Sequence, residues 1–237
     1  NFLQSLTVTG SSIDDEISGT HTSNDVISSG DGNDTINGSD GNDTLTPGNG
    51  IDHITPGLGN DTVNLTEVVA AVDTLYYSYD AGASNVDTVS QFDVRISNDI
   101  ISLDVSELTN PITYGNGNAS SAASLGSINF LDQNLNTNLD FSSNAAATII
   151  KLAPIDKSDF ASALGTSVLT VANDATVNFL WYDVDTSDAV FGYANENVSS
   201  PDDNNIKAED TFVEIVRLSM STSTYTHFLD ADNFVFI

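Results

Sequence analysis

The sequence predicts an all-β protein, in which a parallel β-roll is followed by a β-rich domain of the sandwich or jelly-roll kind. Three observations support this fold class. A nine-residue phrase recurs near the start of the chain, each copy carries one aliphatic residue at a fixed place, and the remaining residues form short strand-like stretches separated by turn signals. We expect the roll to span residues 1–65 and the β-rich domain to span residues 66–237.

The phrase occurs six times between Gly10 and Asn64. Four copies adjoin each other: SGDGNDTIN (29–37), GSDGNDTLT (38–46), PGNGIDHIT (47–55) and PGLGNDTVN (56–64). Two degenerate copies precede them, at 10–18 and 20–28, with an extra residue at Gly19. Every copy has an aspartate at the same place: Asp15, Asp25, Asp34, Asp43, Asp52 and Asp61.

Each copy divides into a turn and a short strand. The first half is rich in Gly and Asn, which tolerate positive φ and favour tight turns. The second half, such as Asp-Thr-Ile, fits one minimal strand with a single inward aliphatic side chain. Two copies then make one coil of a flattened roll. The expected core is the stack of Val8, Ile17, Ile27, Ile36, Leu45, Ile54 and Val63.

The recurring aspartates would stack in rows along such a roll and repel each other. A hard divalent cation held by oxygen atoms would remove this repulsion and fix the turns, so that metal binding would contribute to folding. The alternative is a disordered Gly/Asp-rich linker, but a linker has no reason to keep an aliphatic residue in nine-residue register.

These copies resemble the G-G-x-G-x-D-x-U-x nonapeptide of the RTX (hemolysin-type calcium-binding) family. The resemblance implies Ca²⁺ held by the aspartate carboxylates and turn carbonyls, between turns eighteen residues apart. The implied pairs are Asp25 with Asp43, Asp34 with Asp52, Asp43 with Asp61, and Asp15 with Asp34, where Ser12 and Ile13 replace turn glycines. The turn glycines that fit are Gly30, Gly32, Gly41, Gly48, Gly50, Gly57 and Gly59.

The composition and charge of the chain limit the classes of partner that it can bind. The chain of 237 residues has 34 acidic and 5 basic residues, a formal net charge of −29 and no cysteine. Nucleic acid and anionic membrane surfaces are poor partners for such a chain, whereas cations are natural ones. A halophilic source would also account for the acidity, but calcium binding better explains its place in the repeats. No stretch is long and apolar enough for a membrane span.

The residues after Asn64 predict further strands. Besides Leu65–Asp80 and Asn85–Ser106, the strand-like stretches are 128–132, 147–153, 167–172, 176–184, 188–194, 211–220 and 232–237. Short helices are expected at 120–125 and 157–164. Residues 87–104 resemble the stretch that follows the roll in the C-terminal modules of RTX proteins, and the last stretch, about 180–237, resembles the strand series that closes many type I secreted proteins. The resemblance implies a C-terminal secretion signal, the type I secretion machinery as a partner and an extracellular location. Because the chain opens at Asn1 without Met or a signal-peptide pattern, we expect a longer polypeptide or a removed beginning.

Other candidate sites have simpler interpretations. None of the three histidines lies in an H-E-x-x-H motif, and His53 takes a free position of a repeat, where it should face outward. Asp183, Asp185 and Asp188 fail the EF-hand spacing but leave a surface ion site open. The pairs Trp181–Tyr182 and Tyr76–Tyr77 suggest either a sugar platform or, as we expect, strand packing.

Three functions remain open. The first is a calcium-dependent extracellular structural protein, such as a self-assembling S-layer or cell-surface lattice protein. The second is the C-terminal folding and secretion module of a larger RTX adhesin, toxin or secreted enzyme. The third is an enzyme with an unrecognised site, which we do not expect because no catalytic motif is present. A binding module for carbohydrate or ice is the remaining alternative.

Overall fold

A computed structural model describes residues 4–78, 85–104, 176–195, 212–227, 229 and 231–236, together with the short segments 113–114, 118–119, 130–133, 139–140, 149–152, 169–170 and 205–206. The described strands form a ten-stranded sheet and a six-stranded sheet, with two small sheets beside them. The predicted all-β class is confirmed. No helix in the described part of the chain is long and apolar enough to cross a membrane.

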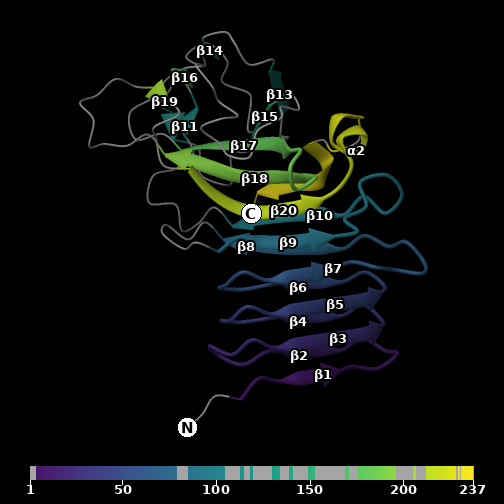
Figure 1. Cartoon of the computed structure of the whole chain (residues 1–237). Helices are drawn as coiled ribbons and strands as arrows, with labels where there is room; N and C mark the ends of the chain where they lie inside the picture. Colours follow the sequence, from purple (N-terminus) through teal and green to yellow (C-terminus); the bar gives the residue numbers. More distant parts are fainter. Residues whose placement is uncertain are drawn as a thin grey trace.

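The first part of the chain is a parallel β-roll. Its strands alternate between the two large sheets (Figure 1), in the order β1 (Thr7–Thr9), β2 (Glu16–Ser18), β3 (Val26–Asp31), β4 (Thr35–Asn37), β5 (Thr44–Asn49), β6 (His53–Thr55) and β7 (Thr62–Asn64). Odd-numbered strands lie in the ten-stranded sheet and even-numbered strands in the six-stranded sheet. Two copies of the phrase therefore make one coil, as predicted.

Strand register follows the repeat length. Thr44 on β5 pairs with Val26 on β3 and with Thr62 on β7, so each of these strands lies over the equivalent residue one coil away. In the degenerate copies Val8 pairs with Ile27 and Ile17 with Ile36, which includes the extra residue at Gly19. The insertion is absorbed in a turn, and the aliphatic stack stays aligned.

The roll continues past the last nonapeptide. β8 (Thr74–Ser78) pairs in parallel with β6, β9 (Asp87–Ser90) with β7, and β10 (Ile100–Asp104) with β8. The hydrogen-bonding pattern therefore has no break at residue 65, where the end of the nonapeptides placed a domain boundary. Longer turns between these strands replace the strict nine-residue spacing, so the division into two domains stays a prediction.

The C-terminal strands cover the end of the roll. β20 (Phe212–Ser219) pairs in parallel with β9, and β21 (Phe234–Phe236) pairs in parallel with β10. β20 also joins an antiparallel meander with β18 (Asp188–Asn195) and β17 (Thr176–Asp183), which extends the same sheet through β15 (Ile149–Leu152) to β13 (Phe130–Gln133) (Figure 1). The meander therefore caps the last coil of the roll.

The remaining strands are two residues long. They are β11 (Thr113–Tyr114), β12 (Asn118–Ala119), β14 (Leu139–Asp140), β16 (Leu169–Thr170) and β19 (Asn205–Ile206). Each of the seven strand-like stretches predicted between 128 and 237 contains a strand. The helices expected at 120–125 and 157–164 lie outside the described residues. An unpredicted helix, α2 (Thr222–His227), begins after Ser221, whose Oγ accepts the Thr224 N–H at 3.1 Å.

We call the C-terminal region from β17 to β21 the cap, and one core runs through the roll and this cap. In the roll it is the predicted aliphatic stack, where Ile27, Ile36, Leu45, Ile54 and Val63 are at most 1 % exposed. Leu75, Val89 and Ile101 extend this stack into the later coils. Val8 and Ile17, at the N-terminal end, are only half-buried. In the cap the core becomes aromatic, with Tyr182, Phe191, Tyr193, Tyr225 and Phe234.

Candidate metal centre

The aspartates of the repeats form two rows, because each stands in the turn just before a strand. The first row belongs to the odd-numbered strands of the ten-stranded sheet. Asp25, Asp43 and Asp61 each directly precede a strand, and Asp87 is the first residue of β9. The turns before the even-numbered strands carry the second row, which is Asp15, Asp34, Asp52, Asp73 and Asp99. Each row runs along the stacked coils, with one aspartate per coil.

In every aspartate after the first of its row, one carboxylate oxygen connects successive coils. Oδ1 accepts the backbone N–H of the aspartate one coil earlier. In the first row, the distance from the backbone N to Oδ1 is 2.7 Å for Asp25 to Asp43, 2.7 Å for Asp43 to Asp61 and 2.8 Å for Asp61 to Asp87. In the second row it is 2.8 Å for Asp15 to Asp34 and Asp34 to Asp52, 3.0 Å for Asp52 to Asp73 and 3.1 Å for Asp73 to Asp99. This bond satisfies a backbone donor in every turn and fixes the carboxylate plane.

The second oxygen, Oδ2, has no such partner in the middle of the rows. The Oδ2 atoms of five aspartates are buried and accept no hydrogen bond from any residue that the structure describes: Asp34, Asp43, Asp52, Asp61 and Asp73. These five side chains are at most 1 % exposed. A buried carboxylate oxygen without a donor is strongly unfavourable unless a cation compensates it. We call these five atoms the orphan oxygens.

At the ends of the rows the second oxygen is satisfied by the protein. Oδ2 of Asp15 accepts the Ser11 N–H at 2.7 Å and the Ser11 hydroxyl at 2.8 Å. Oδ2 of Asp25 accepts the Thr20 N–H at 2.5 Å and the Thr20 hydroxyl at 2.9 Å. At the other end, Oδ2 of Asp99 accepts the N–H of Asp93 at 2.7 Å. The two degenerate repeats therefore differ in chemistry from the clean ones, although their aspartates lie in the same rows.

The electrostatics follow from burial and from the stacking of like charges. Burial, with added repulsion from the neighbouring aspartate of the row, raises the pKa of Asp52 and Asp61 to about 6 and that of Asp73 and Asp87 to about 8. Asp25 behaves in the opposite way. Burial acts to raise its pKa, but the Leu6 and Thr20 donors outweigh burial and hold the pKa below its ordinary value.

The turn glycines have the backbone conformation that the repeats predict. All seven have φ between +103° and +136°: Gly30, Gly32, Gly41, Gly48, Gly50, Gly57 and Gly59. A Cβ on Gly48 would come within 1.9 Å of the Gly30 carbonyl oxygen, and one on Gly57 within 1.8 Å of the Ser39 carbonyl oxygen. These turns therefore stack backbone on backbone, with a carbonyl oxygen of one coil against the glycine of the next.

This donor set fits calcium. Ca²⁺ takes six to eight oxygen ligands at flexible geometry, from carboxylates and backbone carbonyls alike. Within the described residues, no three His, Cys, Asp or Glu side chains converge on one point. The ions would therefore combine the orphan oxygens of single aspartates with turn carbonyls, and bound ions would supply the positive charge that the rows lack.

The pairs implied by the sequence are adjacent in the rows, since Asp25–Asp43, Asp34–Asp52, Asp43–Asp61 and Asp15–Asp34 are each joined by an Oδ1 bond. Sequence reasoning missed Asp73, Asp87 and Asp99. A signal was present, because Asp73-Thr-Leu and Asp87-Thr-Val repeat the Asp-Thr-aliphatic half of the nonapeptide. The spacing hid it, since the bonded aspartates lie 18 residues apart in the clean repeats but 21 and 26 apart afterwards.

The other candidate sites have structural roles. His53 is exposed, as expected, and its Nδ1 lies 2.9 Å from the Tyr76 hydroxyl. Trp181 and Tyr182 are buried in the core of the cap, which supports strand packing over a sugar platform. The acidic group at the β17–β18 turn contacts an arginine, because Arg217 lies 3.0 Å from Asp183 and 3.9 Å from Asp188.

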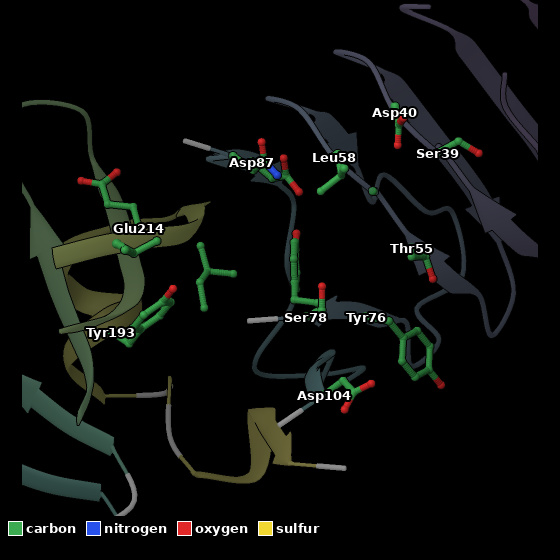
Figure 2. A pocket seen from close by; sticks show the side chains of 15 residues that line it. Ser39, Asp40, Thr55, Leu58, Tyr76, Ser78, Asp87, Asp104, Tyr193 and Glu214 are labelled. Atoms are coloured by element: carbon green, nitrogen blue, oxygen red, sulfur yellow. The ribbon is translucent and has the colours of Figure 1, made fainter. Parts of the chain in front are cut away.

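A pocket of about 430 Å³ lies where the roll meets the meander. Figure 2 shows Asp87 on its wall, with Tyr193 and Glu214 of the cap on one side and Leu58 and Asp40 of the roll on the other. The buried hydroxyl of Tyr77 lies near Asp87, and burial with the charges of Asp87 and Asp61 raises the pKa of this phenol. The first row therefore ends against a pocket and a phenol, and not against another coil.

Comparison with known proteins identifies the repeats. A family model described as the RTX calcium-binding nonapeptide repeat, in four copies, matches residues 21–54 and 28–63. No match was found among the curated proteins or among the solved structures. The matched residues include Asp34, Asp43, Asp52 and Asp61, four of the five aspartates with orphan oxygens. Residues 21–63 are therefore similar to the RTX calcium-binding nonapeptide repeat, and calcium is the ion that this similarity implies.

Proposed function

We propose that this chain is an extracellular structural protein whose roll folds when it binds calcium. The observation that carries the calcium part is the set of five buried carboxylate oxygens without donors. In the absence of a cation these atoms oppose folding, whereas ions placed between the coils would convert them into stabilising contacts. Extracellular calcium would then act as the signal that the chain has left the cell.

The proposal extends this role to self-assembly in an S-layer or similar surface lattice, after export by a type I secretion machinery that reads the C-terminal stretch. A net charge of −29 makes subunits repel each other, so lateral contacts would also require bridging divalent ions. We propose no catalytic role for the chain, because its sequence carries no recognised catalytic motif.

A second candidate is a folding and secretion module within a larger RTX protein. One observation favours it. Val8 and Ile17 are half-buried at the N-terminal end of the roll, whereas their equivalents in the later coils are buried. A further coil stacked on β1 and β2 would bury these two side chains and pair the free edges of both sheets.

A calcium titration tests the folding role. Circular dichroism of the whole chain should show a gain of β structure as calcium is added to protein freed of metal by a chelator. The triple variant Asp34→Asn, Asp43→Asn and Asp52→Asn keeps the Oδ1 atoms that accept the backbone N–H groups of the preceding coil, but it loses three orphan oxygens. Its calcium response should therefore be lost. An unchanged titration in this variant would exclude the rows as the calcium ligands.

Electron microscopy separates the two candidates. Purified protein with calcium should form ordered sheets that dissolve on chelation if the chain is a lattice protein. Particles that stay monomeric at millimolar calcium, while the roll is folded by circular dichroism, would favour the module of a larger protein.

A further inference from the structure

We propose that Asp73, which lies outside all the nonapeptides, holds an additional calcium ion between its own coil and the coil of Asp52. This inference rests on the proposed calcium binding of the rows and extends it beyond the matched residues. It implies that the metal-binding stack does not stop where the repeat pattern stops.

The Asp73 carboxylate is in the same state as those of the clean repeats. Its Oδ1 accepts the Asp52 N–H at 3.0 Å, and its own N–H donates to Asp99 Oδ1 at 3.1 Å. Its Oδ2 is an orphan oxygen and the residue is 1 % exposed. Asp99, the next member of the row, differs because the Asp93 N–H caps its second oxygen. Asp73 is therefore the last member of the second row that needs an ion.

The turn before Asp73 adds a feature that the nonapeptides lack. In two clean coils, the turn glycine donates its N–H to a backbone carbonyl of the next coil, Gly32 to Asn49 at 2.9 Å and Gly41 to Leu58 at 2.8 Å. Gly50 instead donates to the Glu67 side chain, with 3.2 Å to Oε1. A carboxylate thus stands where the other coils place a neutral carbonyl. Its Oε2 is held by the Ala71 N–H at 2.8 Å.

The charges around Asp73 call for a cation. Asp52, Asp99 and Glu67 all act on it electrostatically, and all carry the same sign. The turn has three extra residues relative to the nonapeptide spacing, since Asp73 lies 21 residues after its partner Asp52. The insertion replaces the glycine-rich turn but preserves the carboxylate, which is the part of the repeat that binds the ion.

Calcium stoichiometry of the whole chain tests the inference. Native mass spectrometry and isothermal titration should show one calcium ion fewer in Asp73→Asn than in the wild type. The asparagine keeps the Oδ1 acceptor for the Asp52 N–H, so the fold is expected to survive. Asp14→Asn is the matched control, because it removes one exposed charge and keeps the Oδ1 atom, which accepts the Asn33 N–H of another coil at 2.8 Å. This control should bind as many ions as the wild type.

The outcomes separate the two proposals. If the wild type binds no calcium, the proposed function fails. If the wild type and Asp73→Asn bind the same number of ions with equal affinity, the assignment of Asp73 is overturned while the function of the nonapeptides stands. A crystal structure of the wild type with calcium gives a measurement that does not depend on the variant's folding. An anomalous peak within coordination distance of Asp73 Oδ2 is expected, and a peak-free position there, with ions at Asp34 and Asp52, would contradict the inference.

Discussion

The roll and the C-terminal meander bury their cores in different ways. Each roll strand contributes one small aliphatic side chain, such as Leu45 or Val63, and the turns between strands carry buried aspartates. The meander contributes large aromatic rings, with Phe191 and Phe234 at 5.1 Å and Tyr182 and Tyr225 at 5.5 Å between ring centroids. Its buried acidic residues Asp183 and Asp188 lie 3.0 Å and 3.9 Å from Arg217.

This difference indicates that the two regions depend on the solvent in different ways. The meander places its own cation, Arg217, beside the buried carboxylate of Asp183. The roll leaves five buried oxygens without donors among the described residues, so its electrostatics are completed from outside. The core is nevertheless continuous between them, and β9 pairs directly with β20. Calcium is therefore expected to control the roll first and the cap through this shared boundary.

Chelation should give the largest effect. When EDTA removes calcium, the orphan oxygens lose their compensation, and backbone amides in β3 to β7 should exchange with solvent much faster. Amides in β17, β18 and β20 should retain more protection, because their core and ion pair do not require metal. Hydrogen exchange measured by mass spectrometry, with and without EDTA, checks this difference. Equal loss of protection in both regions would show that the chain folds as one calcium-dependent unit.

The pH dependence of the calcium-free roll should be unusual. Burial raises the pKa of Asp52, Asp61 and Asp99 to about 6 and that of Asp73 and Asp87 to about 8 in the folded state. A raised folded pKa gives stability that is full below the unfolded value near 3.8 and is lost as the pH rises through the folded value. Thermal melts in EDTA should therefore show the roll most stable near pH 4 and progressively weaker up to about pH 8.

Calcium should reverse this trend, because the ion binds ionised carboxylates and its affinity rises with pH. The combined variant Asp52→Asn and Asp73→Asn is the control, since it removes one group with a pKa of about 6 and one with a pKa of about 8. Its melting temperature in EDTA should depend less on pH than that of the wild type. A wild-type roll that becomes more stable from pH 4 to pH 8 without calcium would contradict the prediction.

A cavity in the meander should destabilise the cap whether or not metal is bound. Phe191 is fully buried against Phe234, and Phe191→Ala should lower the free energy of unfolding by about 3–5 kcal/mol. Val235, on the neighbouring strand β21, is 40 % exposed, and Val235→Ala should change stability by less than about 0.5 kcal/mol. Denaturant unfolding followed by tryptophan fluorescence reports on this region, since the single Trp181 lies in β17.

The sequence predicted the roll well because its information is local. The fixed period places Asp34 and Gly41 in turns and Ile36 in the core without knowledge of any distant residue, and the structure has them there. It did not predict that the roll extends to β10, because the 21- and 26-residue connections break the period while the parallel pairing persists. The donors that bond to Oδ2 of Asp15, Asp25 and Asp99 could not be predicted from the sequence either. These bonds depend on where Ser11, Thr20 and Asp93 donate in three dimensions.

The smallest effect is expected at the ion pair of the meander. Nη1 of Arg217 lies 3.0 Å from Asp183 Oδ2, and Nη2 lies 2.8 Å from Glu214 Oε2. Burial acts to raise the pKa of Asp183, but the guanidinium and the N–H groups of Thr186 and Asp185 outweigh it and hold the pKa below its ordinary value. Arg217→Met leaves Asp183 buried with only those turn donors. Because the arginine is partly exposed, we expect a loss of about 1–2 kcal/mol, less than for a fully buried pair.

The sign of the pH dependence makes this prediction specific. A depressed carboxyl pKa gives stability that is present above the unfolded value near 3.8 and is lost as the pH falls through the folded value. The difference in unfolding free energy between the wild type and Arg217→Met should therefore be full at neutral pH and shrink in acid. Arg217→Lys keeps the charge but not the two-pronged geometry, and should fall between them. The wild type and Arg217→Lys should bind no calcium ion at this turn, because a basic side chain lies beside Asp183 and Asp188 in both proteins. An ion bound by the wild type at Asp183 and Asp188 would show that the arginine does not replace the metal there.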